Sequence, residues 1–157
     1  MAFKTDCGGA AMTTNVKLSN KGTTWNTRLQ HIGKHDNEVI LVTFSICNHE
    51  YISKLISKRE RGAGITIICH SKYEVNAYHL KRAFPDLKIY VNPYVHAKLA
   101  LIGPDTVWLS SENLGSKHNT FDASIGIQDT AAFDHYHSQI ESLLRSRDTT
   151  EIKEVTY

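Results

Sequence analysis

Short apolar runs alternate with amphipathic stretches through the middle of the chain. Residues 39–46 form an apolar run without polar alternation, 65–69 form a second apolar run, and a third strand is predicted at 87–91. Such runs are typical of strands that are covered on both faces, as in a parallel sheet. The stretches between them, 49–60 and 74–84, have apolar residues at helical spacing. Together they predict a β-α-β-α-β core with right-handed crossovers.

The pattern changes after Pro93. Shorter strands are predicted at 96–102, 106–111 and 124–128, joined by turns or loops. A last helix is marked by five apolar residues at helical spacing, namely Phe133, Tyr136, Ile140, Leu143 and Leu144. The fold class is therefore α/β, with a mixed, largely parallel central sheet that is flanked by helices.

The same pattern sets the limits of the domain. A short helix is predicted from Thr24, because Trp25, Leu29 and Ile32 share one face. Residues 1–23 are small and polar, and they carry no assignment. The compact domain is predicted over 24–146. It is followed by a charged, frayed tail at 147–157.

Composition narrows the class of protein. The chain has 157 residues, of which 41% are hydrophobic, and this suits one domain without disulfide or metal staples. The net charge of +2 does not by itself indicate a nucleic-acid partner, although nine histidines add positive charge as the pH falls. Three cysteines, an odd number, favour reduced thiols and a cytoplasmic protein. The sequence has no signal-peptide core and no apolar run of membrane length, so we expect no membrane partner.

The segment 95–127 concentrates polar groups that suit phosphodiester chemistry. On a strand, His96 and Lys98 would project from one face, and Ser111 and Asn113 share the same two-residue offset at the end of the next strand. If the two strands are neighbours, an imidazole, an ammonium, a hydroxyl and an amide converge. The imidazole could attack phosphorus, while the lysine and asparagine stabilise charge on its oxygens. The plainer alternatives are a solvated strand face for the first pair and a turn for the second.

The spacing of these residues resembles the signature of the phospholipase D superfamily, H-x-K-x4-D-x6-G-S-x-N. The matching residues are His96, Lys98, Ser111 and Asn113. The strand–helix–strand unit of residues 40–69 is also similar to the unit that precedes this motif in the family. The resemblance covers residues 24–145 and implies a phospholipase D-like single domain.

Two positions depart from the signature. Gly103 stands at the family's aspartate, which is largely structural, and Ser110 stands at its glycine, where a side chain could crowd the substrate. Asp105 is interpreted as a hairpin-turn residue and His118 as a solvated loop histidine, with a contact to substrate as the less favoured alternative for His118. Asp122 occupies the place of the acid that orients the catalytic histidine in compact nucleases of the family, and the plain alternative for it is a helix cap or a loop residue.

The resemblance implies a two-histidine reaction that needs no metal and no other cofactor. One His96 attacks phosphorus to form a covalent phosphohistidine, and a second histidine protonates the leaving oxygen. Because the complete spaced set of H-x-K with the downstream serine and asparagine occurs once in the chain, a complete site implies a homodimer. The Cys47-Asn48-His49 and Cys69-His70 groups match no common zinc spacing, so their thiols are interpreted as structural.

Three functions follow in order of preference. The first is a metal-independent nuclease that hydrolyses DNA or RNA, since a mildly basic, histidine-rich surface suits nucleic acid better than lipid. The second is a catalytically silent module that binds nucleic acid or a protein partner, and the departures at Gly103 and Ser110 motivate it. The third is a phospholipase, which the superfamily permits.

Overall fold

The computed structural model describes residues 13–19, 38–46, 49–57, 62–114 and 122–154. Eight strands of this part form one mixed sheet in the order β1-β7-β6-β5-β2-β3-β4-β8. They are β1 (Thr13–Ser19), β2 (Val39–Thr43), β3 (Ile65–His70), β4 (Lys88–Asn92), β5 (Leu99–Ile102), β6 (Thr106–Ser110), β7 (Asp122–Gln128) and β8 (Thr150–Glu151). β2, β3 and β4 pair in parallel, and the other neighbours pair antiparallel.

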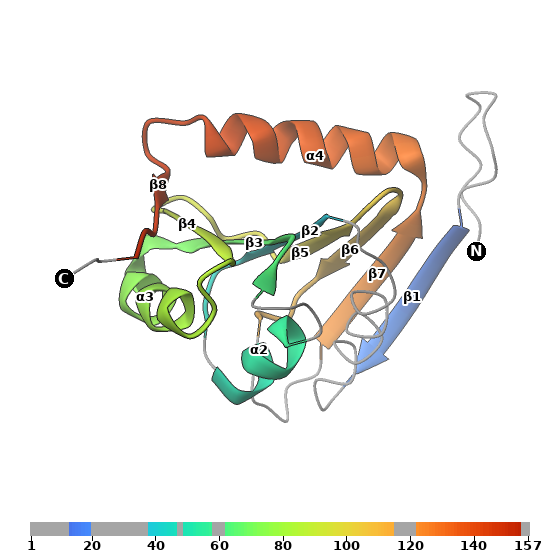
Figure 1. The fold of residues 1–157 in the computed structure, drawn as a ribbon. Helices are drawn as coiled ribbons and strands as arrows, with labels where there is room; N and C mark the ends of the chain where they lie inside the picture. The colour runs from blue at the N-terminus through green and yellow to red at the C-terminus, as the bar shows by residue number, and fades with distance from the viewer. Residues whose placement is uncertain (1–12, 20–37, 47–48, 58–61, 115–121, 155–157) are drawn as a thin grey trace.

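Helices cover both faces of this sheet (Figure 1). α2 (His49–Ile56) and α3 (Glu74–Ala83) lie on one face, and the long α4 (Thr130–Leu144) runs along the other. A 3-10 turn, η2 (Ser71–Tyr73), leads from β3 into α3. The predicted mixed α/β fold, in one domain flanked by helices, is confirmed. The described sheet is not largely parallel, however, because only two of its seven strand pairings are parallel.

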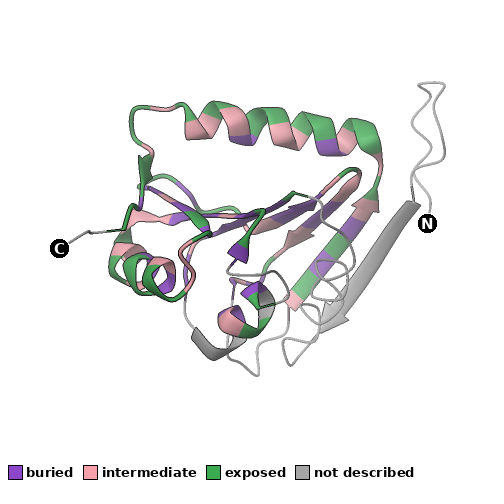
Figure 2. Cartoon of the chain, in the orientation of Figure 1, coloured by how far each residue is buried: buried purple, intermediate pink, exposed green. Residues whose placement is uncertain are grey.

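The central strands are buried on both faces, as their unbroken apolar runs predict. All five residues of β2 are buried. Leu41 packs with the core on the α2 and α3 side, whereas Ile40 packs with Phe133 on the α4 side. Successive side chains of a strand point to opposite faces, so a strand between two helix layers needs apolar residues at every position. Figure 2 shows this burial concentrated in the middle of the sheet.

Two strand limits differ from the prediction. β2 ends at Thr43 instead of continuing to residue 46, and β5 begins at Leu99 instead of residue 96. Residues 93–98 connect β4 to β5, which lie on opposite sides of the β2–β3 pair, so this segment crosses the ends of both strands. The prediction that His96 and Lys98 share a strand face is therefore wrong, because both precede the strand.

Both ends of the chain add a strand that the sequence pattern did not assign. β1 pairs antiparallel with β7 and forms one edge of the sheet. β8 pairs with β4 at the other edge, and the buried Ile152 donates its N–H to the Ile89 carbonyl at 2.8 Å. The segment predicted to fray thus begins inside the packed fold. The helix predicted from Thr24 lies outside the described residues.

Glycines allow two close approaches that shape the sheet. Gly62 has a φ of 82°, a region that favours glycine, and a Cβ there would lie 3.0 Å from the Cβ of Leu87. On β7, a Cβ at Gly126 would lie 2.8 Å from Cη2 of Trp108, so only a glycine lets the indole pack there. The β6–β7 pairing continues to Ser110 and Ser124. It thereby brings the start of β7 beside the end of β6.

Candidate active site

Polar residues gather at one end of the strands, where β2, β3, β4 and β6 end and β5 and β7 begin. The register fixes this arrangement, because Leu99 pairs with both Val42 of β2 and Leu109 of β6. Residues just before β5 and just after β6 therefore become neighbours. The predicted adjacency of the two motif segments, 96–98 and 110–113, is a consequence of the antiparallel β5–β6 hairpin.

Residues 43–45, which we call the β2 corner, hold the Asn113 side chain. The buried Thr43 hydroxyl donates to the Ser45 carbonyl at 3.0 Å and accepts from the Leu114 N–H at 2.9 Å. The Asn113 Oδ1 accepts from the Ser45 N–H at 3.4 Å and lies 3.5 Å from the Thr43 Oγ1. The amide is thus oriented by main-chain and buried groups rather than by an exposed side chain.

The same corner contacts His96. The His96 imidazole packs against the Phe44 ring with centroids 5.0 Å apart, and it is exposed to solvent. Lys98 donates from Nζ to the His96 carbonyl at 3.1 Å, and its own carbonyl accepts from the Ser110 N–H at 3.0 Å. His96 and Asn113 therefore both contact the β2 corner. Lys98 is held beside them by the bond of its carbonyl to Ser110, the last residue of β6.

Ser111 and Asp122 form the far side of this group. The Ser111 hydroxyl donates to Asp122 Oδ1 at 2.8 Å and accepts from the Ala123 N–H at 3.1 Å, while the Ser111 N–H donates to the Ala123 carbonyl at 3.0 Å. These bonds fix the serine between β6 and β7. The contact described for the Asp122 carboxylate is thus with Ser111, and its orientation of His96 stays a prediction.

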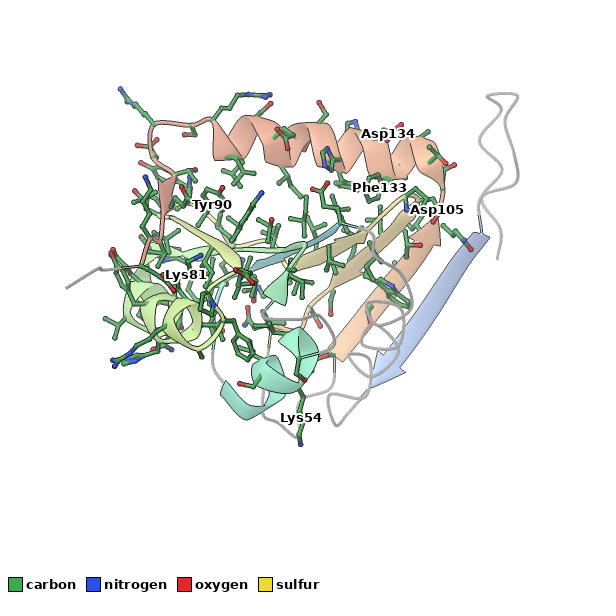
Figure 3. All side chains as sticks on the ribbon, viewed as in Figure 1. Lys54, Lys81, Tyr90, Asp105, Phe133 and Asp134 are labelled. Atoms are coloured by element: carbon green, nitrogen blue, oxygen red, sulfur yellow. The ribbon has the colours of Figure 1, made fainter. Side chains whose placement is uncertain are left out.

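The two departures from the signature take different places. Ser110 turns its hydroxyl back to the main chain, where it accepts from the Glu112 N–H at 3.0 Å. Gly103 lies at the opposite end of the β5–β6 hairpin, beside Asp105 in the turn. Asp105 accepts from the Thr106 hydroxyl at 3.0 Å and from Gln128 Nε2 at 3.2 Å, so the hairpin-turn interpretation is confirmed. Asp105 is labelled in Figure 3, and its carbonyl accepts from the N–H of Asp129, the N-cap of α4, at 2.8 Å. The missing aspartate thus removes no group from the gathered residues.

Sequence reasoning missed the β2 corner. Thr43 and Ser45 were read as part of a continuous apolar strand, although two hydroxyl residues near the end of such a run are a turn signal. Their role depends on Asn113 and Leu114, which are about seventy residues away in the chain. His118, Cys47 and the Asn48 that follows it lie outside the described residues.

Cys69 belongs to the buried core, whereas the neighbouring His70 is partly exposed at the end of β3. Cys69 is fully buried, and burial raises the pKa of its thiol to about 12 because the thiolate is poorly solvated there. Among the residues that the structure describes, no three His, Cys, Asp or Glu side chains gather closely enough to hold a metal ion.

The fold and the gathered groups define a single-domain α/β protein with an imidazole, an ammonium, a hydroxyl and an amide at one end of the sheet's strands. A family model described as cardiolipin synthase, PLD-like domain, matches residues 29–144. The chain therefore belongs to the phospholipase D-like family. A search of curated proteins finds no match.

Solved structures show the same fold. Nuc from Salmonella typhimurium, a phospholipase D family member, matches with a TM-score of 0.74 at 12% identity, over 91% of this chain and 99% of Nuc. NucT from Helicobacter pylori matches with a TM-score of 0.71 at 18% identity, over 86% of this chain and 97% of NucT. Phosphatidylserine synthase from Haemophilus influenzae has a TM-score of 0.74 at 11% identity, and the match covers 93% of this chain but 41% of the synthase. In the described part of this chain, no helix has both the length and the apolar character needed to span a membrane.

Proposed function

We propose that the protein is a metal-independent phosphodiesterase, and specifically a nuclease that acts on DNA or RNA. The observation that carries the proposal is the convergence of His96, Lys98 and Asn113 on the β2 corner and its neighbouring strand end. These are the groups that a phosphoryl transfer needs when protein side chains supply both the nucleophile and the charge stabilisation. The superfamily includes phosphodiesterases and nucleases, and the chain is similar to Nuc and NucT over nearly the whole of both proteins.

The proposed reaction has two steps. In the first, an imidazole nitrogen of His96 attacks phosphorus, and the bond from phosphorus to the leaving oxygen breaks as a second histidine gives that oxygen a proton. In the second, the same second histidine takes a proton from water, whose oxygen attacks phosphorus and releases His96. Lys98 and Asn113 contact the phosphoryl oxygens on which negative charge accumulates. Ser111 and Asp122 complete the set by holding the β6–β7 side of the site.

The second histidine comes from a second copy of the chain. The full spaced set of H-x-K with a downstream S-x-N starts only at His96, because the H-x-K triplets at His70 and His79 lack the downstream serine and asparagine. His96 is also exposed at the strand ends, where a two-fold related copy can approach. Each subunit of the proposed homodimer contributes His96, Lys98, Ser111 and Asn113 to a shared site. Activity therefore depends on assembly.

A catalytically silent nucleic-acid-binding module is the second candidate. Gly103 and Ser110 depart from the family signature. The fold is also similar, with a TM-score of 0.58 at 13% identity, to TrmBL2, an archaeal chromatin protein described as having a novel mode of DNA binding. A lipid phosphodiesterase is the third candidate, since the family model carries the name of cardiolipin synthase.

The deciding experiment incubates the protein with single- and double-stranded DNA and RNA in excess EDTA, beside His96→Ala. We expect the wild type to cleave at least one substrate and the variant to cleave none. Cleavage by both proteins would reject His96 as the nucleophile. Cleavage by neither, with retained binding, would favour the silent module, and hydrolysis of phospholipid vesicles alone would favour the lipid enzyme.

Mixing the two proteins tests the shared site. If one site uses two copies of His96, an equal mixture after subunit exchange keeps about a quarter of the activity of the wild type at the same total concentration. Independent sites would keep about half. Sedimentation of the two proteins alone gives the control, because His96→Ala should leave the dimer intact.

A further inference from the structure

Aromatic rings surround Phe44 at the strand ends that carry His96. The Phe44 ring lies with its centroid 5.0 Å from His96 on one side and 5.0 Å from His70 on another. The Tyr73 ring lies 5.6 Å from Phe44 in an edge-to-face arrangement. These distances are in the range of direct ring–ring contact. The candidate nucleophile therefore belongs to a cluster of rings that is centred on Phe44.

The backbone holds these rings in place. His70 ends β3, and its Nδ1 accepts from the Lys72 N–H at 3.0 Å, which fixes the imidazole plane at the start of η2. The His70 N–H in turn donates to the Phe44 carbonyl at 3.2 Å, so the ends of β2 and β3 are joined. A cluster of rings that is ordered before a ligand arrives loses little conformational entropy on binding.

Tyr94 is an exposed ring on the same connection as His96. Its side chain is 78% exposed, the most exposed large hydrophobic residue described, and it lies two positions before His96. Its backbone is nevertheless anchored, because the Tyr94 N–H donates to Asn92 Oδ1 at 2.8 Å. Asn92 is buried at 1% exposure and donates to the Thr149 hydroxyl at 2.9 Å. An exposed aromatic ring on a fixed loop beside a nucleophile is a ready surface for a planar ligand.

We propose that Phe44, His70, Tyr73 and Tyr94, together the aromatic edge, bind unpaired nucleobases next to the scissile phosphate. The inference rests on the proposed nuclease function and names single-stranded nucleic acid as its substrate class. In the proposed reaction Lys98 and Asn113 serve the phosphate, so base contacts need other side chains. Aromatic side chains accept any base through its π-face, whereas bases inside a duplex are already stacked on one another and cannot reach the rings.

Binding to labelled oligonucleotides in EDTA tests the aromatic edge apart from cleavage. We compare the wild type with Tyr94→Ala and Tyr94→Phe on a single strand, a hairpin duplex and a single strand with abasic sites. Tyr94→Ala should weaken binding to the intact single strand by about fivefold or more, and Tyr94→Phe should bind like the wild type. Binding to the abasic strand and to the duplex should be weak for the wild type and unaffected by Tyr94→Ala.

The matched control is Tyr78→Ala, because Tyr78 is an exposed tyrosine on α3 outside the aromatic edge. It should bind all three ligands like the wild type. Equal binding of the intact single strand by the wild type and Tyr94→Ala would overturn the inference while leaving the nuclease proposal standing. Conversion of Tyr94→Ala from dimer to monomer in sedimentation would also overturn it, since Tyr94 would then serve the subunit interface. Failure of the wild type to cleave any nucleic acid would reject the nuclease, and the binding differences would still decide the aromatic edge.

Discussion

The two ends of the β5–β6 hairpin carry similar polar groups in different settings. At the turn end, side chains pair with one another or close local structure: Glu38 with His137 at 3.2 Å, Asp105 with Gln128 at 3.2 Å, and Asp129 with the N–H of Ala132 at 2.8 Å, where it caps α4. At the open end, the imidazole of His96 packs on Phe44 and faces solvent.

The contrast separates polar groups that stabilise the fold from polar groups that can act on a ligand. A capping aspartate contributes about 1 kcal/mol to the stability of its helix and needs no further partner. At the open end, the surrounding main chain orients Asn113 and Ser111 without covering them completely. Orientation by main-chain groups leaves the reactive side of a site accessible, which is a general property of functional sites.

The largest expected effect separates the two histidines. His96→Asn removes a nucleophile and should lower phosphodiester cleavage by about 10³-fold or more. His137→Asn changes a histidine that lies 3.2 Å from Glu38 and stacks on Phe133, and it should leave the rate unchanged. Initial rates on one oligonucleotide in EDTA measure both. A large loss in His137→Asn would break the distinction between the two ends.

The next effect concerns charge. Lys98→Met should lower the cleavage rate by about 10²-fold, because it removes a cation from the phosphoryl oxygens while keeping the length of the side chain. Asp105→Asn, in the turn, should retain the wild-type rate. Single-turnover kinetics with both variants provides the comparison. An equal loss in the two would mean that Lys98 acts only through stability, and urea unfolding checks this directly.

The β2 corner gives a smaller effect with two components. Thr43→Val keeps the shape of the side chain but leaves the Leu114 N–H without its acceptor, so it should cost about 1–3 kcal/mol of unfolding free energy. It should also slow cleavage, because Asn113 loses a neighbouring hydroxyl. Thr43→Ser keeps the hydroxyl and should retain the wild-type stability and cleavage rate.

The matched change at the turn end is Thr106→Val, which removes a hydroxyl bonded to Asp105. It should cost about 0.5–1.5 kcal/mol and leave the rate unchanged. Urea unfolding and cleavage rates of the three variants separate stability from positioning. A slow but fully stable Thr43→Val would favour positioning alone, and an unchanged rate would reject any role of Thr43 at the site.

The smallest expected effect concerns the pH dependence of stability at Cys69, the interior neighbour of His70 in the aromatic edge. Cys69 is buried next to His70, and the pKa of its thiol is raised from 9.0 to about 12. Below pH 9 the thiol is neutral in both states, so its contribution to stability is fully present. As the pH rises from 9 toward 12, the unfolded thiol ionises first and stability falls, by about 1 kcal/mol at pH 10.

Urea midpoints at pH 8 and pH 10 measure this loss, and Cys69→Ala isolates it from the titration of other groups. The wild type should lose more stability between the two pH values than the variant does. Equal losses would show that the Cys69 environment admits the thiolate.

Much of the fold could be predicted from local pattern, and the exceptions have physical causes. The strands at 39–46 and 65–69 were recognisable because burial on both faces demands mostly apolar runs. β1 and β8 were not, because edge strands are short or polar and resemble loops in sequence. The start of β5 was misplaced because residues 96–98 continue an apparent alternation, while the crossing from β4 to β5 takes them out of the sheet.

The sequence alone determined which reactive side chains the protein has and how they are spaced along the chain. The imidazole, ammonium, hydroxyl and amide of residues 96–113 follow from local order, and so does the antiparallel hairpin that returns Ser111 toward Lys98. Only the tertiary structure decided what holds them. The β2 corner reaches Asn113 and His96 across more than fifty residues of chain, and the aromatic edge combines the ends of β2, β3 and β4. Such contacts depend on strand order, which burial and crossover geometry select for the whole sheet at once and which no local pattern encodes.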